Sequence, residues 1–407
     1  MNNYQKFHTK RDWENKDITA INREEAHSPW GAYESFEQAK SCDRLASKWV
    51  DSLDGSWRFL YCDTPLTAGE FYCEDYDRSG WSDITVPGNW EVQGFGKPIY
   101  TNVMMPWNQH PHEKHILHAT SDSGWGMPNP PYIPEENPTG LYYRTFNIPA
   151  EWLERDIFIH FKGVETAYYL WINGREVGYS QDSKLPSEFN ITPYIKAGEN
   201  SVALQVMRFA DSTHLEDQDY WYLSGIYRSV YLYAKPKTRI TDFKIDALPE
   251  GGNGVVAADV RVNPFDGLAE YKIRLDITDM AGNILASGES NVNPSADYRD
   301  DWKPTAHTAR VRLTVENVGL WTPETPTLYK AIMTLIAPNG EAADFESCRI
   351  GFKRVEISNG IIYLNGKRLI VRGVHRHEHE ARHGRAVPVS HMIEEIKTMK
   401  RLNINSV

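Results

Sequence analysis

The sequence predicts a mostly β protein in which two β-sandwiches precede the beginning of an α/β unit. Short runs of alternating apolar residues, separated by turn signals, recur from residue 51 to about residue 350. Helical spacing appears near the end of the chain, in Met392, Ile396 and Met399. The 407 residues suit two to four domains, and 41% apolar with 24% charged residues is a globular composition.

Residues 1–50 are predicted to form an irregular N-terminal arm. They are polar and charged, and Trp13, Trp30 and Trp49 are their sparse apolar anchors. Such a segment becomes ordered where it packs along another domain or a partner subunit. The first residues have no apolar core, so we expect no secretory signal there.

Residues 51–235 are predicted to form a jelly roll or a similar sandwich. Polarity alternates along residues 56–61 and 156–161, and Asn173-Gly174 is typical of a type I′ hairpin. Residues 107–139 interrupt the pattern with several prolines and no periodicity. We interpret this stretch as a long loop or insertion, and loops of that length are uncommon unless they are functional.

Residues 236–350 are predicted to form an immunoglobulin-like β-sandwich. Strand-like runs such as 257–262 and 271–277 recur, and Gly282-Asn283 and Asn339-Gly340 supply turns. About 110 residues with about seven strands suit this fold, although the sequence shows no Cys pair typical of it.

In residues 351–407 the pattern changes to strand, helix, strand. A hairpin at Asn365-Gly366 leads into a strand at 368–371, Ser390 is a candidate N-cap for the helix, and residues 403–407 open another strand. One helix and a bare final strand cannot bury a parallel sheet. We therefore expect the chain to be a fragment that stops inside this domain.

Charge and hydropathy argue against nucleic acid and membrane partners. The chain has 44 Lys and Arg against 55 Asp and Glu, a net charge of −11. No apolar run approaches the length of a transmembrane helix. The four cysteines (Cys42, Cys62, Cys73 and Cys348) form no CxxC motif, so we expect the reduced thiols of a cytoplasmic protein.

A histidine-rich motif follows the predicted strand at 368–371. It contains His375, His377, His379 and His383, with Glu378 and Glu380 between them. In barrels this end of a strand carries the chemistry. The histidines could bind a metal, but alternate residues need not converge, so hydrogen bonding to a polar substrate is the favoured role. Glu378 could be a general acid, but neighbours on one strand do not face each other across a glycosidic bond.

Two further motifs and the aromatic content leave alternatives open. Residues 215–221 combine three acids with two aromatic residues, which suits sugar hydroxyls, a hard cation or a solvated acidic loop. Four histidines in the Pro-rich stretch could bind zinc or be incidental; they are His110, His112, His115 and His118. Aromatic residues make up 12% of the chain, which indicates either sugar stacking or aromatic β-sandwich cores.

Several long motifs, in one order along the chain, resemble the β-galactosidases of glycoside hydrolase family 2. They include V-P-G-N-W at 86–90, P-I-Y-T-N at 98–102, the run 178–189, the acidic segment 215–221 followed by 224–228, and the histidine-rich motif 372–379. The resemblance extends from about residue 10 to the last residue.

This resemblance implies a jelly-roll sugar-binding domain, an immunoglobulin-like domain and a (β/α)8 TIM barrel with the active site. It implies that Asn102 hydrogen-bonds galactose, that Asp219 contacts the galactose 6-hydroxyl and a sodium ion, and that His377 stabilises the transition state. The nucleophilic glutamate, the acid/base glutamate and most magnesium ligands would lie beyond Val407. The stretch around 107–130 is longer than the corresponding connection in the family, so no role transfers to it.

We therefore expect the N-terminal part of a cytoplasmic, retaining β-galactosidase that acts on terminal β-D-galactosides such as lactose, with Mg²⁺ and Na⁺ in the complete enzyme. The 407 residues alone should be inactive. The resemblance also suggests a homo-oligomer, often a tetramer, with the arm at an interface.

One alternative is another family 2 activity such as β-glucuronidase or β-mannosidase. The D-Q-D motif at 217–219 argues against it. The other is a non-catalytic carbohydrate-binding module or a subunit that complements a separate catalytic chain.

Overall fold

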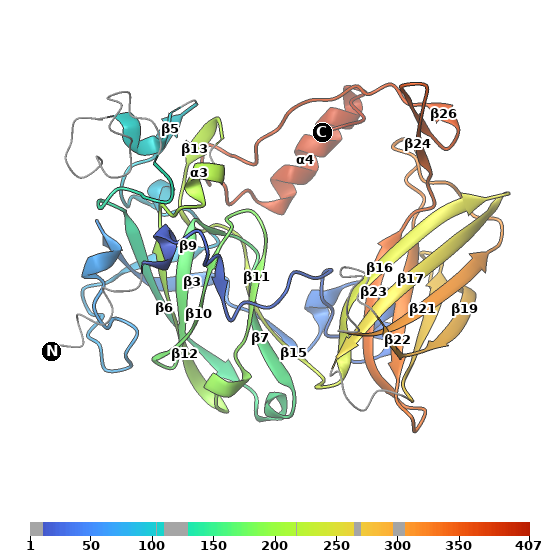
Figure 1. The fold of residues 1–407 in the computed structure, drawn as a ribbon, viewed down its shortest axis with the longest axis horizontal. Helices are drawn as coiled ribbons and strands as arrows, with labels where there is room; N and C mark the ends of the chain where they lie inside the picture. Colours follow the sequence, from blue (N-terminus) through green and yellow to red (C-terminus); the bar gives the residue numbers. More distant parts are fainter. Residues whose placement is uncertain (1–10, 103, 110–128, 217, 264–269, 296–305) are drawn as a thin grey trace.

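The computed structural model describes residues 11–102, 104–109, 129–216, 218–263, 270–295 and 306–407. Figure 1 shows two β-sandwiches side by side and a C-terminal segment with one long helix that passes across the top of both. The mostly β architecture predicted from the sequence is confirmed. In the described part of the chain no helix is both long enough and apolar enough to cross a membrane.

The first sandwich is built from two antiparallel sheets. The larger has the order β1-β10-β9-β12-β6-β3-β4, with bounds Ala20–Ile21, Arg175–Gln181, Ala167–Ile172, Gly198–Met207, Thr139–Ile148, Gly55–Cys62 and Ser82–Val86. The smaller has the order β11-β7-β15-β2, with bounds Ser187–Asn190, Asp156–Phe161, Val230–Lys235 and Val50–Ser52. The hairpin predicted between β9 and β10 is confirmed, because Asn173 and Gly174 both have the positive φ of a type I′ turn.

Both faces of the larger sheet are buried. Leu204 of β12 points into the core between the two sheets, where Trp57, Ile159 and Leu232 also pack. Its neighbour Ala203 points to the other face, as strand alternation requires, and joins a second apolar cluster. Most described tryptophans lie in these clusters, so core packing explains much of the aromatic content.

The second sandwich pairs two four-stranded sheets. One has the order β16-β17-β21-β20, with bounds Arg239–Glu250, Asn253–Asn263, Ala306–Val315 and Asn293–Ser295. The other has the order β19-β18-β22-β23, with bounds Ile284–Asn291, Lys272–Thr278, Tyr329–Ile336 and Ala342–Ile350. Every second residue of β17 is buried, including Val256 and Val260, and these pack against Leu275 and Met333 of the facing sheet.

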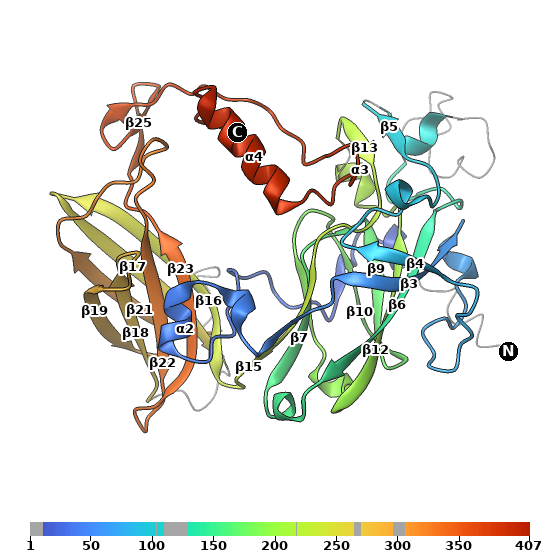
Figure 2. The same ribbon diagram turned by 180° about the vertical axis from the view of Figure 1, so that it is seen from behind.

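The N-terminal arm contacts both sandwiches. Its strand β1 pairs with β10. Trp30 stacks on Tyr233 of β15, with ring centroids 4.2 Å apart. Its helix α2 (Phe36–Ser41) then packs on β22 and β23 of the second sandwich, which Figure 2 shows from behind. The arm is therefore ordered by packing along other domains, and it contains short helices and strands of its own.

The C-terminal segment begins with the small sheet β24-β25-β26 (Val355–Ser358, Ile361–Leu364 and Lys367–Arg368) and ends after helix α4 (Val389–Arg401). The predicted strands at 368–371 and 403–407 do not form: β26 ends at Arg368, and a single isolated parallel bridge joins Gly373 to Ser406 on either side of the helix. The prediction of Ser390 as N-cap is wrong. Pro388 occupies that position, because its fixed φ of −61° suits the extended residue before a helix.

Candidate functional site

A two-stranded ribbon at the end of the first sandwich carries two of the predicted site residues. Strand β5 (Ile99–Thr101) pairs with β13 (Tyr220–Tyr222), with Thr101 opposite Tyr220 and Tyr100 opposite Trp221. Continued by one residue, this register brings Asn102 opposite Asp219. Both residues are exposed.

The exposed face of this ribbon is polar and aromatic. The Tyr100 hydroxyl donates a hydrogen bond of 2.6 Å to Oδ1 of Asp219, which fixes the orientation of that carboxylate. This hydrogen bond raises the pKa of Tyr100, so the phenol stays protonated as a donor. Trp221 is 48% exposed, unlike most described tryptophans, and its ring lies 5.6 Å from that of Tyr100.

The loop between Gly373 and helix α4 brings the third predicted residue to the same ribbon. The ring of His377 stacks on Tyr220, with centroids 5.8 Å apart and planes 22° apart. His379 lies 5.6 Å from the same tyrosine ring, and burial lowers the pKa of its imidazole. Figure 1 shows this loop descending from the C-terminal segment to β13. Asn102, Asp219 and His377 thus all lie at this ribbon and come from two domains, while their roles in binding stay predictions.

Glu378 and Glu380 each have a structural partner. The Glu378 carboxylate lies 3.2 Å from the Arg228 guanidinium and 3.6 Å from that of Arg376. Glu380 pairs with His383 at 2.5 Å. These contacts tie the loop together and agree with the view that the two glutamates are not a catalytic pair.

No metal centre is evident among the residues that the structure describes, where no group of three or more His, Cys, Asp or Glu side chains could hold an ion. His375, His379 and His383 therefore do not converge. Asp219 and Asn102 do offer oxygen donors of the kind that a hard cation prefers. The remaining ligands of a sodium or magnesium ion would have to come from elsewhere. Asp217 and the four histidines at 110–118 lie outside the described residues.

A second polar cavity lies beside the ribbon, at helix α3 (Thr213–Glu216). It has a volume of about 540 Å³, and Glu216, Asp182 and Lys16 are among the residues that line it. Burial raises the pKa of Glu216, whose Oε1 accepts a hydrogen bond from the Ser183 amide. The acidic segment 215–221 therefore contributes to two separate places, because Glu216 lines this cavity and Asp219 lies on the ribbon.

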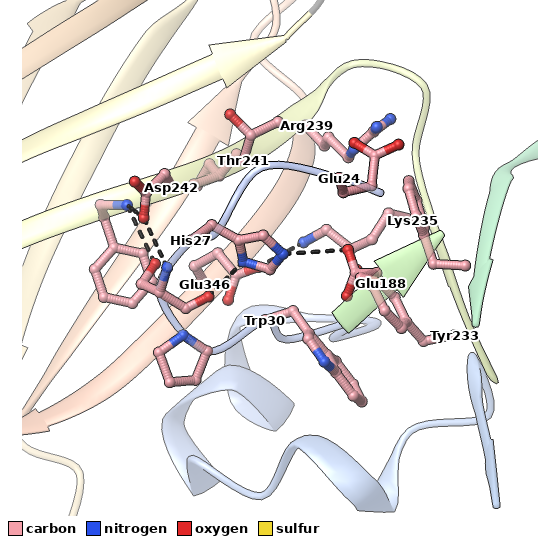
Figure 3. Close-up of a pocket in the computed structure, with 15 residues that line it drawn as sticks. Glu24, His27, Trp30, Glu188, Tyr233, Lys235, Arg239, Thr241, Asp242 and Glu346 are labelled. Atoms are coloured by element: carbon pink, nitrogen blue, oxygen red, sulfur yellow. Dashed lines mark hydrogen bonds and ion pairs between the residues drawn. The ribbon is translucent and has the colours of Figure 1, made fainter. Parts of the chain in front are cut away.

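A third polar cluster lies where the arm meets both sandwiches (Figure 3). Its cavity of about 60 Å³ has room for about two water molecules, at ~30 Å³ each. Its charges satisfy one another. Glu188 lies 3.1 Å from His27 and 2.8 Å from His160, and Lys235 lies 2.8 Å from both Asp344 and Glu346. It is too small for a sugar and is a junction rather than a binding site.

Titration in this cluster follows from its ion pairs. Burial alone would raise the pKa of Glu188, but hydrogen bonds from His160 and His27 outweigh burial and lower it to about 2. Burial alone would lower the pKa of His27, but its hydrogen bond to the Glu188 carboxylate and that negative charge raise it to about 9. Both groups are therefore charged near neutral pH.

Three family profiles match consecutive parts of the chain. Residues 50–236 match the description "Glycosyl hydrolases family 2, sugar binding domain". Residues 238–353 match "Glycosyl hydrolases family 2", and residues 355–407 match "Glycosyl hydrolases family 2, TIM barrel domain". Together these matches leave out little beyond the arm.

Solved structures show the same fold at low identity. A β-glucuronidase from Bifidobacterium dentium is 20% identical, with a TM-score of 0.68 over 87% of this chain and 56% of that one. A β-glucuronidase from an uncultured Clostridium is 17% identical, with a TM-score of 0.66 over 93% and 56%. A β-glycosidase from Bacteroides vulgatus is 20% identical, with a TM-score of 0.65 over 87% and 40%.

The chain spans about half the length of these structures. At such identity the likeness concerns the fold alone and does not assign a substrate. The chain belongs to glycosyl hydrolase family 2, of which it carries the sugar-binding jelly roll, the immunoglobulin-like domain and the beginning of the TIM barrel.

Proposed function

We propose that the chain is the N-terminal part of a retaining β-galactosidase that hydrolyses terminal β-D-galactosides such as lactose. The observation that carries this proposal is that Asn102, Asp219 and His377 all lie at the β5–β13 ribbon. The two catalytic glutamates would come from the part of the barrel that follows Val407. The 407 residues alone would then bind sugar without hydrolysing it.

The roles follow from the chemistry of glycoside hydrolysis. The transition state has oxocarbenium character, and contacts to sugar hydroxyls strengthen in it. The Asn102 amide and the Asp219 carboxylate can bind hydroxyls, and the His377 imidazole can donate to a hydroxyl whose acidity rises with the developing charge. Because Asp219 is held by Tyr100, its carboxylate needs little reorganisation when the sugar binds.

Asp219 supports a galactoside over a glucuronide. Galactose carries a neutral hydroxymethyl group at C5, whereas a glucuronide carries a carboxylate there. A carboxylate of the enzyme that faces this group can accept a hydrogen bond from the 6-hydroxyl but repels a uronic acid. This argument opposes the β-glucuronidase alternative, whose support is the fold likeness alone.

Cations, assembly and location are further parts of the proposal. Asp219 and Asn102 would supply oxygen ligands for a sodium ion that orients the 6-hydroxyl. Most magnesium ligands would lie outside this chain. The four cysteines are free, which supports a reducing cytoplasm. We also propose a homo-oligomer, of which a tetramer is the form that the family resemblance suggests.

The decisive experiment assays the complete protein on aryl β-galactoside, β-glucuronide and β-mannoside. We expect hydrolysis of the galactoside with retention, and Asp219→Asn should lower kcat/KM for it about ten- to a hundredfold and weaken sodium activation. Higher kcat/KM for the glucuronide or the mannoside would overturn the substrate assignment. Sugar binding by the complete protein without hydrolysis of any of the three would favour the non-catalytic alternative.

A further inference from the structure

We propose that Arg385 is a positioning residue that locks the barrel loop carrying His377 onto the jelly-roll ribbon carrying Asp219. The inference deepens the proposed function and rests on it for its catalytic part. Its structural part concerns how two domains are joined at the site, and can be tested without any substrate.

The first contact of Arg385 is a buried ion pair. Its guanidinium pairs with the carboxylate of Glu165, which belongs to strand β8 (Val164–Glu165) of the jelly roll. Arg385 is 8% exposed and Glu165 is 5% exposed. A buried charge that loses its partner is strongly unfavourable, so removing the Arg385 guanidinium should leave Glu165 unpaired and loosen the loop from the jelly roll.

The second contact is made by the backbone. The Arg385 amide donates a hydrogen bond of 2.7 Å to the Asn89 side-chain oxygen, and the Asn89 amide group donates one of 3.1 Å to the Ser224 carbonyl. The preceding Gly384 has φ +60°, and a Cβ on it would lie 2.7 Å from the same Asn89 oxygen. The loop therefore approaches Asn89 too closely for a side chain at position 384.

The third contact reaches the site itself. The Arg385 guanidinium lies 5.2 Å from the ring centroid of Tyr220 and 4.4 Å from that of Tyr227. Lys184 donates a hydrogen bond of 2.5 Å to the Tyr220 hydroxyl and lies 3.9 Å from Glu165. The Tyr220 side chain is thus in contact with Lys184, Arg385 and Glu165, to which its hydroxyl donates at 3.4 Å.

Tyr220 is the link to both proposed substrate contacts. The ring of His377 stacks on it, and Asp219 is the residue before it. A change in the position of Arg385 would therefore move the loop that carries His377 and loosen the tyrosine ring on which His377 rests. Even a small displacement of a side chain that contacts the sugar should lower the rate of catalysis, because the reaction depends on near-attack geometry.

Position 385 requires an arginine, and another cationic side chain such as lysine should not replace it fully. A planar guanidinium can pair with Glu165 while its face lies near the two tyrosine rings, whereas a lysine ammonium is a point charge that can satisfy the ion pair only. We therefore expect Arg385→Lys to recover part of the function that Arg385→Gln loses.

The test uses the complete protein with Arg385→Gln, Arg385→Lys and the matched control Arg382→Gln, since Arg382 is an exposed residue of the same loop. The substrate is whichever of the three aryl glycosides the complete protein hydrolyses best. On it, Arg385→Gln should lower kcat/KM about ten- to a hundredfold and weaken the binding of a lactone-type inhibitor by a similar factor. Arg385→Lys should recover to within about tenfold of the wild type, and Arg382→Gln should stay within about twofold.

Hydrogen exchange provides the readout that needs no activity. In Arg385→Gln the amides of residues 374–388 should exchange at least about tenfold faster, while strands such as β12 keep their protection. Wild-type exchange in this loop would overturn the proposal even in an active enzyme. Faster exchange in a complete protein that hydrolyses none of the three glycosides would retain the lock and reject the proposed function.

If Arg385→Gln does not fold, the double variant Glu165→Gln, Arg385→Gln provides the test instead. It replaces the ion pair by two carboxamides, so no unpaired charge is buried. We expect it to fold and still to show fast exchange in residues 374–388, because the two carboxamides form no ion pair and supply no guanidinium beside the Tyr220 ring. Wild-type exchange and wild-type kcat/KM in the double variant would refute a positioning role.

Discussion

The arm junction and the site junction are buried ionic clusters that connect different parts of the chain, and they contain different cationic side chains. At the arm junction, His27 and His160 pair with Glu188, and Lys235 pairs with Asp344 and Glu346. At the site junction, Arg385 pairs with Glu165 beneath Tyr220. Imidazoles titrate in the accessible pH range and a guanidinium does not. The first junction therefore loses the charge of His27 as the pH rises through its pKa of about 9, while the guanidinium of the second keeps its charge.

The junctions also differ in what they position. The arm junction joins the two sandwiches and the arm (Figures 2 and 3), and no proposed substrate contact lies in it. The site junction joins the jelly roll to the barrel loop beside Asp219 and His377. Variants at the first should change stability and leave catalysis in the folded protein intact, whereas variants at the second should lower catalysis even in protein that folds.

The largest effect is expected at Lys235, which is buried between two carboxylates. Lys235→Met leaves Asp344 and Glu346 without their cation, so the free energy of unfolding should fall by about 3–5 kcal/mol. Denaturant unfolding measures this, with the exposed Lys237→Met as control. A loss below about 1 kcal/mol would show that the two carboxylates do not depend on this lysine.

The second prediction concerns pH. The folded pKa of Glu188, about 2, lies below its ordinary value of 4.5, so its contribution is present above pH 4.5 and is lost as the pH falls toward 2. The folded pKa of His27, about 9, lies above its ordinary value of 6.5, so its contribution is present below pH 6.5 and is lost between 6.5 and 9. The junction should be most stable between about pH 4.5 and 6.5.

This prediction is checked by unfolding at pH 6 and pH 9. The wild type should lose up to about 3 kcal/mol over this range through His27. His27→Asn should remove most of that difference, and the exposed His375→Asn should not. An unchanged pH slope in His27→Asn would mean that the titration belongs to other groups of the cavity, such as Glu24 or Glu346.

The sequence predicted the sandwiches well because their signals are local. Alternation along β17 and the Asn-Gly turn after β9 depend on residues that are neighbours in the chain. Motif resemblance supplied Asn102, Asp219 and His377. Ser390 failed as a cap because Pro388, two residues earlier, begins the helix more effectively.

The site junction could not be predicted from the sequence in the same way. Glu165 and Arg385 lie in different domains, and neither stands in a periodic pattern or a recognisable motif. Their pairing depends on how the barrel loop docks, which is a tertiary contact between distant segments. Gly384 was a possible signal, since a glycine before a charged loop residue is consistent with a close backbone approach.

The third prediction concerns the catalytic side of the comparison. His377→Ala should weaken planar lactone inhibitors about tenfold or more and change the affinity for galactose-like inhibitors much less. In the proposed function, the sugar hydroxyl bound by His377 would become more acidic in the transition state. The melting temperature should stay nearly fixed, since His377 is exposed. Equal losses for both inhibitor classes, or a lower melting temperature, would identify His377 as a structural histidine.

The smallest effect is expected at Tyr100, whose hydroxyl orients Asp219 from the facing strand. Tyr100→Phe keeps the ring beside Trp221 and removes only this donor, so the carboxylate should remain charged but less well oriented. We expect kcat/KM to fall about two- to tenfold, with little change in stability. Because Tyr100 acts through Asp219, the two substitutions should not be additive. In the Asp219→Asn background, Tyr100→Phe should cost less than about twofold, and a full independent loss there would show that Tyr100 contacts the sugar by itself.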